Sequence, residues 1–255
     1  MKVIQYNILD GCHDKDRLQL FSRWMKKQEY DVAGFNEVNN WTGEEFQEKA
    51  KEWGFPFSFL FEMKSSPYFV GIMSKFPVEV VNTDEKNFYH GLIHVKIQGI
   101  HFFVTHLTPF GSEYRELETR RLAEFVSSIE DPVMVMGDLN TLSPLDKDHY
   151  DSVGMREKLI AKEKSLLQHT KNYEIDYIPM KNLLDAGLFD IGYDASFKHS
   201  IPTPLKHNLQ YAKRLRIDYM LGNAAMMEYN PIAKVVCNEE VDVLSDHYPI
   251  ESKWG

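Results

Sequence analysis

The chain of 255 residues has 43% hydrophobic and 26% charged residues, the proportions of an ordinary globular protein rather than of a disordered or fibrous one. Its net charge of −9 argues against adhesion to nucleic acid or anionic membrane through the field of the whole molecule. Two cysteines, Cys12 and Cys237, do not make a disulfide framework or a zinc-ligand spacing, and no apolar run is long enough to span a bilayer.

Strand and helix patterns alternate at the start of the chain. The opening residues alternate and carry β-branched side chains, so they predict a strand rather than a signal peptide, and we expect an intracellular, cytoplasmic protein. The predicted elements are a strand at 2–8, a helix at 17–28, a strand at 31–38 and a helix at 42–54, which opens on a Thr42–Glu45 capping box. These strand–helix units indicate an α/β architecture with covered sheets, in a single domain over residues 1–255.

The middle of the chain predicts consecutive strands without helices between them, at 55–63, 68–81, 91–97 and 100–107. A tight connection at Gln98–Gly99 is typical of an antiparallel hairpin. The alternate phenylalanines from Phe55 to Phe61 predict one face of a core strand rather than a membrane-seeking segment. Beyond them we expect a helix at 114–130, a strand at 132–139, a mixed region at 154–190, and strands near 216–221, 232–237 and 247–253.

An acid and an amide follow the apolar strand that begins at Pro132. Side chains alternate along a strand, so Asp138 and Asn140 would project from the same face if the chain stays extended that far. Alone, this pair could equally be a helix cap. Other apolar strands also end in polar groups, and the full set comprises Asn7, Glu37, His106, Asp138, Asn140, Asp218, Asp246 and His247.

Each of these residues has an ordinary structural explanation when taken singly, such as a turn, a solvated acid or a core histidine. Together they point to a site, because strand ends at one edge of an α/β protein converge. Hard oxygen ligands such as Glu37, Asp246 and Asn7 suit Mg²⁺ or Mn²⁺. A histidine next to an acid, with a second acid to orient it, suits proton transfer.

One segment, 195–217, is strongly basic, with five lysines and arginines and no acid. Its two prolines and two histidines, His199 and His207, favour a loop over a helix. The segment is either a solvated basic loop or a loop that faces a substrate phosphate. In the second case Lys206, Lys213 and Arg216 are the candidate contacts.

The order of the motifs, from Asn7 through "GFNEV", "THL", "GDLN" and "RIDY" to "SDH", resembles the endonuclease/exonuclease/phosphatase superfamily along essentially the whole chain. The stretch 71–79 also looks like the central strand and turn of that family. The resemblance implies a four-layer sandwich, two mixed β-sheets packed face to face with helices on both outer faces. It also implies a divalent-metal-dependent phosphoesterase that cleaves a phosphodiester by in-line attack of an activated water.

The resemblance implies a metal site around Glu37 as principal ligand, with Asn7 and Asp246 close to the metal directly or through water. Two departures stand beside it. Many relatives have Gln before the Glu where this chain has Asn36, and Asp10 lies one position too far from Asn7 to match a second metal-binding acid of some nucleases.

The resemblance also implies the catalytic roles. Asp138 orients or deprotonates the attacking water, and Asn140 holds that water and the scissile phosphate. His106 contacts the phosphate, while His247, paired with Asp218, stabilises transition-state charge or transfers a proton. Either Asp138 or His247 could be the general base.

Three interpretations of the function are weighed. The first is a nucleic acid, nucleotide or small phosphodiester, with a short single strand favoured over a long duplex by the charge of −9. The second is a phosphatase or phospholipase C-type reaction on inositol phosphates or sphingolipids. The third, a catalytically silent binding module, is disfavoured because every motif position is filled.

Overall fold

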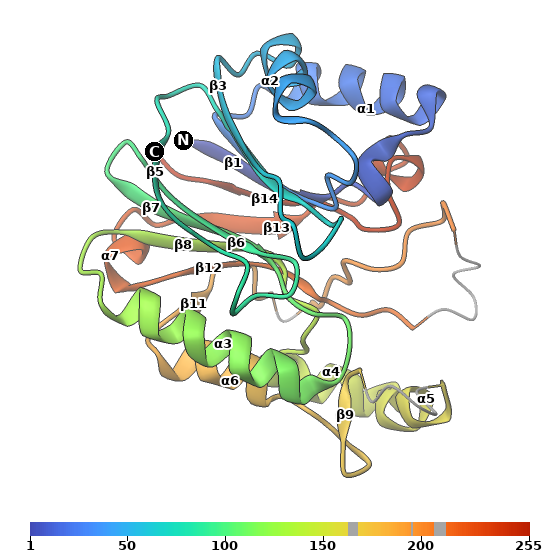
Figure 1. The fold of residues 1–255 in the computed structure, drawn as a ribbon. Helices are drawn as coiled ribbons and strands as arrows, with labels where there is room; N and C mark the ends of the chain where they lie inside the picture. Colours follow the sequence, from blue (N-terminus) through green and yellow to red (C-terminus); the bar gives the residue numbers. More distant parts are fainter. Residues whose placement is uncertain (163–167, 195, 207–212) are drawn as a thin grey trace.

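The computed structural model describes residues 1–162, 168–194, 196–206 and 213–255. Two six-stranded sheets lie face to face, with helices on both outer faces (Figure 1). This arrangement confirms the predicted four-layer sandwich. Among the described residues, no helix is both long enough and apolar enough to cross a membrane.

The first sheet contains both ends of the chain. Its strands, in spatial order, are β13 (Ile232–Val235), β14 (Ile250–Lys253), β1 (Lys2–Asn7), β2 (Val32–Asn36), β4 (Val70–Ser74) and β3 (Phe57–Phe61). β1 and β2 are parallel and the other neighbours are antiparallel. The connection between the parallel pair is α1 (Lys15–Gln28), which covers the outer face together with α2 (Gly43–Glu52) (Figure 1).

The second sheet is built from the middle of the chain. Its strands, in spatial order, are β11 (Phe189–Asp190), β12 (Asp218–Gly222), β8 (Val133–Asp138), β7 (Ile100–His106), β6 (Leu92–Ile97) and β5 (Glu79–Asp84). β7 and β8 are parallel across α3 (Ser112–Ser127), and α6 (Ile178–Asp185) packs beside α3. The predicted hairpin at Gln98–Gly99 is confirmed, with φ of 50° and 81° at its two turn residues.

The core consists of apolar layers that account for the sequence patterns. Residues such as Val3, Ile72 and Met134 fill the space between the two sheets, while Phe21 and Phe46 pack under the helices of the first sheet. The central strands are therefore buried on both faces, which is why they read as nearly continuous apolar runs.

The structure confirms one expected feature and corrects two others. The Thr42–Glu45 capping box is present. The phenylalanine strand is only partly a core face: Phe55 is buried but Phe57 is 40% exposed, because β3 lies at the edge of its sheet. The expected strand at 68–81 is two strands, β4 and β5, which belong to different sheets.

The remaining elements are short and lie outside the two sheets. They are α4 (Lys147–Ser152), α5 (Met155–Lys162), β9 (Thr170–Lys171), β10 (Glu174–Ile175) and α7 (Ala224–Met227), with 3₁₀ turns at Asp10–Cys12, Pro144–Asp146 and Val241–Val243.

Candidate active site

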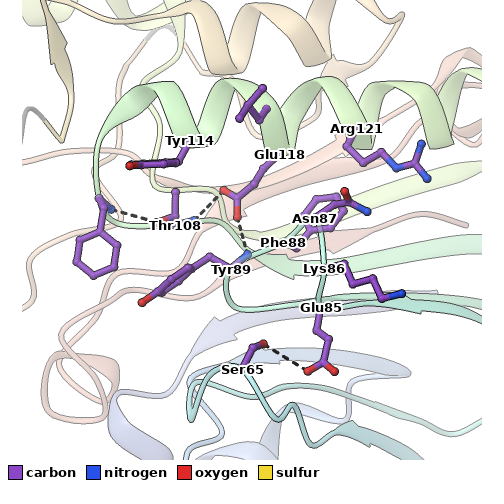
Figure 2. A pocket seen from close by; sticks show the side chains of 12 residues that line it. Ser65, Glu85, Lys86, Asn87, Phe88, Tyr89, Thr108, Tyr114, Glu118 and Arg121 are labelled. Carbon is purple, nitrogen blue, oxygen red and sulfur yellow. Dashed lines mark hydrogen bonds between the residues drawn. The ribbon is translucent and has the colours of Figure 1, made fainter.

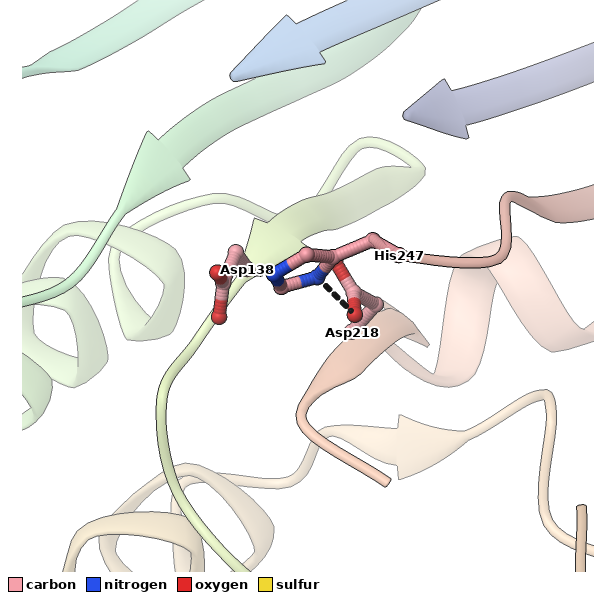
Figure 3. A group of neighbouring side chains, drawn as sticks. All are labelled: Asp138, Asp218 and His247. Atoms are coloured by element: carbon pink, nitrogen blue, oxygen red, sulfur yellow. Dashed lines mark hydrogen bonds and ion pairs between the residues drawn. The ribbon is translucent and has the colours of Figure 1, made fainter. Parts of the chain in front are cut away.

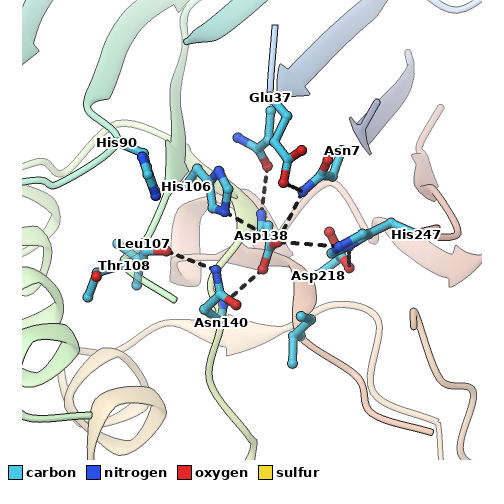
Figure 4. A network of polar contacts seen from close by, with 12 residues as sticks. Asn7, Glu37, His90, His106, Leu107, Thr108, Asp138, Asn140, Asp218 and His247 are labelled. Atoms are coloured by element: carbon cyan, nitrogen blue, oxygen red, sulfur yellow. Dashed lines mark hydrogen bonds and ion pairs between the residues drawn. The ribbon is translucent and has the colours of Figure 1, made fainter. Parts of the chain in front are cut away.

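Strand register places three of the predicted residues side by side on the second sheet. His106, at the end of β7, pairs with Asp138 at the end of the parallel strand β8. Asp138 in turn pairs with Asp218, the first residue of the antiparallel strand β12. Directly paired residues present their side chains on the same face of a sheet, so these three groups meet at one edge (Figure 4).

Asp138 and Asn140 are neighbours for a different reason from the one expected. β8 ends at Asp138, and Asn140 has a left-handed backbone with φ of 47°, so the chain is not extended between them. A turn joins them instead: the Asn140 backbone N–H donates to Asp138 Oδ1 at 3.0 Å. The Asn140 amide also donates to the carbonyl of Leu107 at 2.9 Å, which fixes its side chain against the end of β7.

Asn7 links the first sheet to the second. Its side-chain amide donates to Glu37 Oε1 and to Asp138 Oδ2, at 3.1 Å each. Glu37 follows β2 with a left-handed φ of 57°, and its Oε2 accepts the Asp10 backbone N–H at 2.9 Å. Strained backbone of this kind gathers at functional sites, and here both Glu37 and Asn140 have it.

Asn36 precedes Glu37 at the end of β2, and its side chain is completely buried. Its Oδ1 accepts from the Gln5 amide and from the Asp138 backbone N–H, both at 2.7 Å. Its Nδ2 donates to the carbonyl of Thr105 at 3.1 Å. Asn36 therefore joins the two sheets directly behind Asp138, a role that sequence reasoning missed because an amide in an apolar strand does not reveal its partners.

His247 and Asp218 form a buried pair that faces Asp138 (Figure 3). His247 Nδ1 donates to Asp218 Oδ2 at 2.8 Å, and His247 Nε2 lies 3.7 Å from Asp138 Oδ2. Burial alone lowers the pKa of the His247 imidazole, but the Asp218 and Asp138 carboxylates outweigh it and raise the pKa to about 10. Burial, followed by the charge of Asp218, raises the pKa of Asp138.

A second histidine, His90, stands behind His106 and was not predicted. The two rings lie 4.6 Å apart, and His90 Nδ1 is within 2.7 Å of the Ser66 hydroxyl. His106 Nε2 is 3.5 Å from Asp138 Oδ2. Burial lowers the pKa of both histidines, to about 4 for His90, so both are neutral near pH 7. No motif marks His90 in the sequence.

These groups open into a pocket of about 490 Å³. Its polar residues include Glu37, His106, Asp138, Asn140 and His247, and its apolar rim includes Tyr68, Tyr89, Phe110 and Ile201. This volume lies within the range of small-molecule sites, and polar groups from several elements converge on it.

The remaining predicted residues have mixed outcomes. Asp246 is half-buried, and its charge helps to raise the pKa of His247, so it lies close to the site. The pocket residue His169 has a pKa lowered to about 3, first by burial and then by neighbouring charges that include Lys213. Lys206 lines a different hollow beside Asp14 and Asp16. His207 lies outside the described residues.

Arg216 is the clear error among the sequence predictions. Its side chain is buried, and its guanidinium donates to Asp146 Oδ2 from Nε at 2.8 Å and lies 2.7 Å from Asp190 Oδ2. It also packs over the Tyr219 ring at 4.7 Å. Arg216 therefore serves the fold rather than a substrate phosphate.

The donor groups fit a divalent cation. Glu37 Oε1 and Asp138 Oδ2 both accept from the Asn7 side-chain amide, so Asn7 holds the two carboxylates near each other. Asp138, Asp218 and His247 also offer ligand atoms within 4.8 Å of one another. Carboxylate and amide oxygens are the ligands that hard divalent cations take. A buried acid–histidine pair beside such a carboxylate cluster suits metal-assisted hydrolysis with proton transfer.

Comparison with known protein families identifies the family of this chain. The sequence matches the model of the Endonuclease/Exonuclease/phosphatase family over residues 4–247. The chain therefore belongs to that family, whose members cleave phosphoester bonds. No curated protein sequence matches the chain.

Solved structures share the fold at low sequence identity. An AP endonuclease from Archaeoglobus fulgidus has a TM-score of 0.75 and 18% identity, and the match covers 100% of this chain and 99% of that one. A 3′ phosphatase from Neisseria, bound to a product DNA hairpin, has a TM-score of 0.75 and 18% identity, and the match covers 100% of this chain and 99% of that one. A 3′-5′ exonuclease from Neisseria meningitidis has a TM-score of 0.74 and 18% identity, and the match covers 100% of this chain and 99% of that one.

Proposed function

We propose that this phosphoesterase hydrolyses a phosphodiester in a short single-stranded nucleic acid or a nucleotide, with Mg²⁺ or Mn²⁺ as the metal. One observation carries the proposal: Asp138 is shared between the Asn7–Glu37 pair on one side and the His247–Asp218 pair on the other. A metal-binding half and a proton-handling half thus meet at one carboxylate.

Glu37 is the principal metal ligand in this proposal, with Asn7 and Asp246 beside it. The alternative set of Asp138, Asp218 and His247 is less favourable, because a cation there would have to displace the 2.8 Å hydrogen bond from His247 to Asp218. Oxygen ligands also suit Mg²⁺ better than an imidazole does. When bound, the cation supplies Lewis-acid stabilisation of charge on the phosphoryl oxygens, worth several kcal/mol.

Asp138 is the general base and His247 the cationic partner. The Asp218 carboxylate, 2.8 Å from His247 Nδ1, holds the pKa of the imidazole above its ordinary value, so the cationic form of His247 is favoured. Asp138 can accept the proton of the attacking water, and the imidazolium 3.7 Å away then balances the negative charge that develops on the phosphoryl group.

Asn140 and His106 bind the phosphoryl oxygens. Asn140 is held by its bonds to Asp138 and Leu107, so its side chain is positioned before substrate arrives. His106 is buried and neutral, and so offers a hydrogen bond without adding charge. Lys213, whose charge helps to lower the pKa of the pocket residue His169, is the candidate contact for a neighbouring phosphate.

The substrate class rests on charge and on the pocket. A net charge of −9 disfavours the many phosphate contacts that a long duplex requires. A pocket of about 490 Å³ with an aromatic rim accommodates one nucleotide and can stack a base. The Neisseria phosphatase with the same fold was solved with a DNA hairpin, which supports a nucleic-acid substrate for this chain.

The test is hydrolysis of a panel of substrates by purified protein supplied with Mg²⁺. The panel contains single-stranded oligonucleotides, nucleotides, abasic DNA, inositol phosphates and sphingomyelin. We expect Asp138→Asn to lose at least about 10²-fold in kcat while its unfolding midpoint remains close to that of the wild type, because only the base is removed. Exposed Asp148→Asn is the matched control. Wild-type turnover by Asp138→Asn would overturn the assignment, and a preference for inositol phosphates or sphingomyelin would overturn the substrate class.

A further inference from the structure

A second hollow, of about 700 Å³, adjoins the catalytic pocket (Figure 2). It lies between α3 and the segment 85–89 that leads from β5 toward β6. Three residues, Ser65, Tyr89 and Phe110, line both cavities. A substrate that extends beyond the scissile phosphate can therefore reach the second hollow past Tyr89 and Phe110.

The shared wall is fixed from behind by α3. The buried carboxylate of Glu118 accepts the backbone N–H of Tyr89 at 2.8 Å and that of Thr108 at 2.9 Å. Arg115 donates to the carbonyls of Thr108 and Phe110. The Tyr89 and Phe110 rings meet edge to face at 5.4 Å. The wall is thus preformed, which lowers the entropy lost when a ligand binds.

The hollow has an aromatic end and a cationic end. Tyr89 and Tyr114, which are 50% and 58% exposed, lie toward one end, whereas Lys86 and Arg121 lie toward the other (Figure 2). The lining also contains two carboxylates, but both are already hydrogen-bonded. Glu118 accepts the two backbone N–H groups above, and Glu85 accepts the Lys64 backbone N–H at 2.9 Å and the Ser65 hydroxyl at 3.3 Å.

We propose that this hollow binds the nucleotide adjacent to the scissile phosphate of a single-stranded substrate. Its base stacks on Tyr89 and Tyr114, and its outer phosphate meets Lys86 and Arg121. The inference rests on the proposed function and deepens it. Aromatic rings followed by cations match the alternation of base and phosphate along a single strand, and every base offers a π-face to such rings. Arg121 also contacts Glu124 at 2.8 Å, but both side chains are exposed, so this pair competes weakly.

The experiment measures binding rather than turnover. The Asp138→Asn protein is titrated in Mg²⁺ against two fluorescent single strands of six nucleotides, one of thymidines and one of abasic tetrahydrofuran units. The two strands have the same phosphates and differ only in bases. We expect the base-bearing strand to bind about 5-fold to 150-fold more tightly.

Variants then locate the preference. Adding Tyr114→Ala should reduce it by about 5-fold, while Tyr114→Phe, which keeps the ring, should retain it. Tyr229→Ala, at an exposed tyrosine outside both cavities, is the matched control. Arg121→Ala should weaken both strands alike, because both carry phosphates.

Three results would overturn the proposal: equal affinity for the two strands, no binding of either strand, or a preference that Tyr114→Ala leaves unchanged. These are distinguishable from failure of the proposed function. That failure is the absence of metal-dependent turnover by the wild type, which the binding measurement does not use.

Discussion

At the residue scale, three buried histidines near one carboxylate take opposite protonation states. His90 and His106 lose their charge because burial disfavours the imidazolium. His247 is also buried, but the Asp218 and Asp138 carboxylates more than offset the cost of burial. The residue types alone do not assign these states; the partners do. His247 is therefore the cationic member of the site, and His106 a neutral donor.

The pH dependence of kcat/KM follows from these states. Activity should rise with pH as Asp138 loses its proton, at a pKa above the ordinary aspartate value because of burial and Asp218, and lowered again by a bound cation. It should fall as pH approaches about 10, where His247 loses its proton. A pH–rate profile of the wild type and of His247→Gln checks this. The alkaline fall should disappear in the variant, and its persistence there would contradict the assignment.

The motif residues of the site could be predicted because each belongs to a short pattern with a chemical meaning. Asp138, Asn140, Asp218 and His247 meet as expected, although a turn rather than an extended strand joins the first two. Asn36 and His90 could not be predicted, because their roles depend on partners from distant segments. Arg216 was misassigned because a basic stretch does not reveal which of its members is buried.

At the element scale, Arg216 holds the start of β12 in place. Arg216 lies two positions before Asp218 and pairs with Asp146 and with Asp190. Asp146 ends a 3₁₀ turn and Asp190 ends β11, so the guanidinium ties both segments to β12. This arrangement fixes the strand that presents Asp218 to His247.

Replacing Arg216 should therefore show up as lost stability. We expect Arg216→Ala to lower the free energy of unfolding by about 3–5 kcal/mol, because two buried carboxylates lose their partner. Urea denaturation followed by circular dichroism measures the loss, with Arg214→Ala, an exposed neighbour, as control. If Arg216→Ala kept wild-type stability and raised only KM, the substrate-contact role would be restored.

Most of the fold could be predicted at this scale, but the assignment of strands to sheets could not. Alternation and turn residues predicted the hairpin at Gln98–Gly99 and the strand–helix units. The run 68–81 looks continuous because β4 and the first part of β5, with Val80 and Val81, carry apolar β-branched residues, yet the chain crosses from one sheet to the other between Ser74 and Glu79. Periodicity reports local structure, whereas the partner sheet is decided by long-range packing.

At the scale of the whole molecule, the protein is negatively charged but has cationic side chains near its two adjoining cavities. The net charge is −9, but Lys86, Arg121 and Lys213 lie around the two adjoining cavities or influence them. A few phosphates can be bound there, whereas a duplex requires more cationic contacts than a chain with a net charge of −9 favours.

Single strands should therefore be better substrates than duplexes. We expect kcat/KM for a short single-stranded oligonucleotide to exceed that for the same sequence in a duplex by at least about 10-fold, because fewer phosphate contacts are available than a duplex requires. Gel assays with the annealed and the single strand, at one salt concentration, measure the ratio. An equal or reversed ratio would contradict this reading of the charge.

Stacking the two sheets brings Asn7 and Glu37 from one and Asp138 from the other to a common edge. The central claim is that this edge is a divalent-cation site serving phosphate-ester hydrolysis. The most direct test follows hydrolysis of a single-stranded oligonucleotide as Mg²⁺ is returned to chelator-treated protein. Wild type and Glu37→Gln are compared, with Glu44→Gln at an exposed glutamate as control.

We predict that wild type and Glu44→Gln recover activity at the same Mg²⁺ concentration, while Glu37→Gln needs more than about 10-fold more. Full activity in chelator, or the same Mg²⁺ requirement in Glu37→Gln as in wild type, would contradict the account.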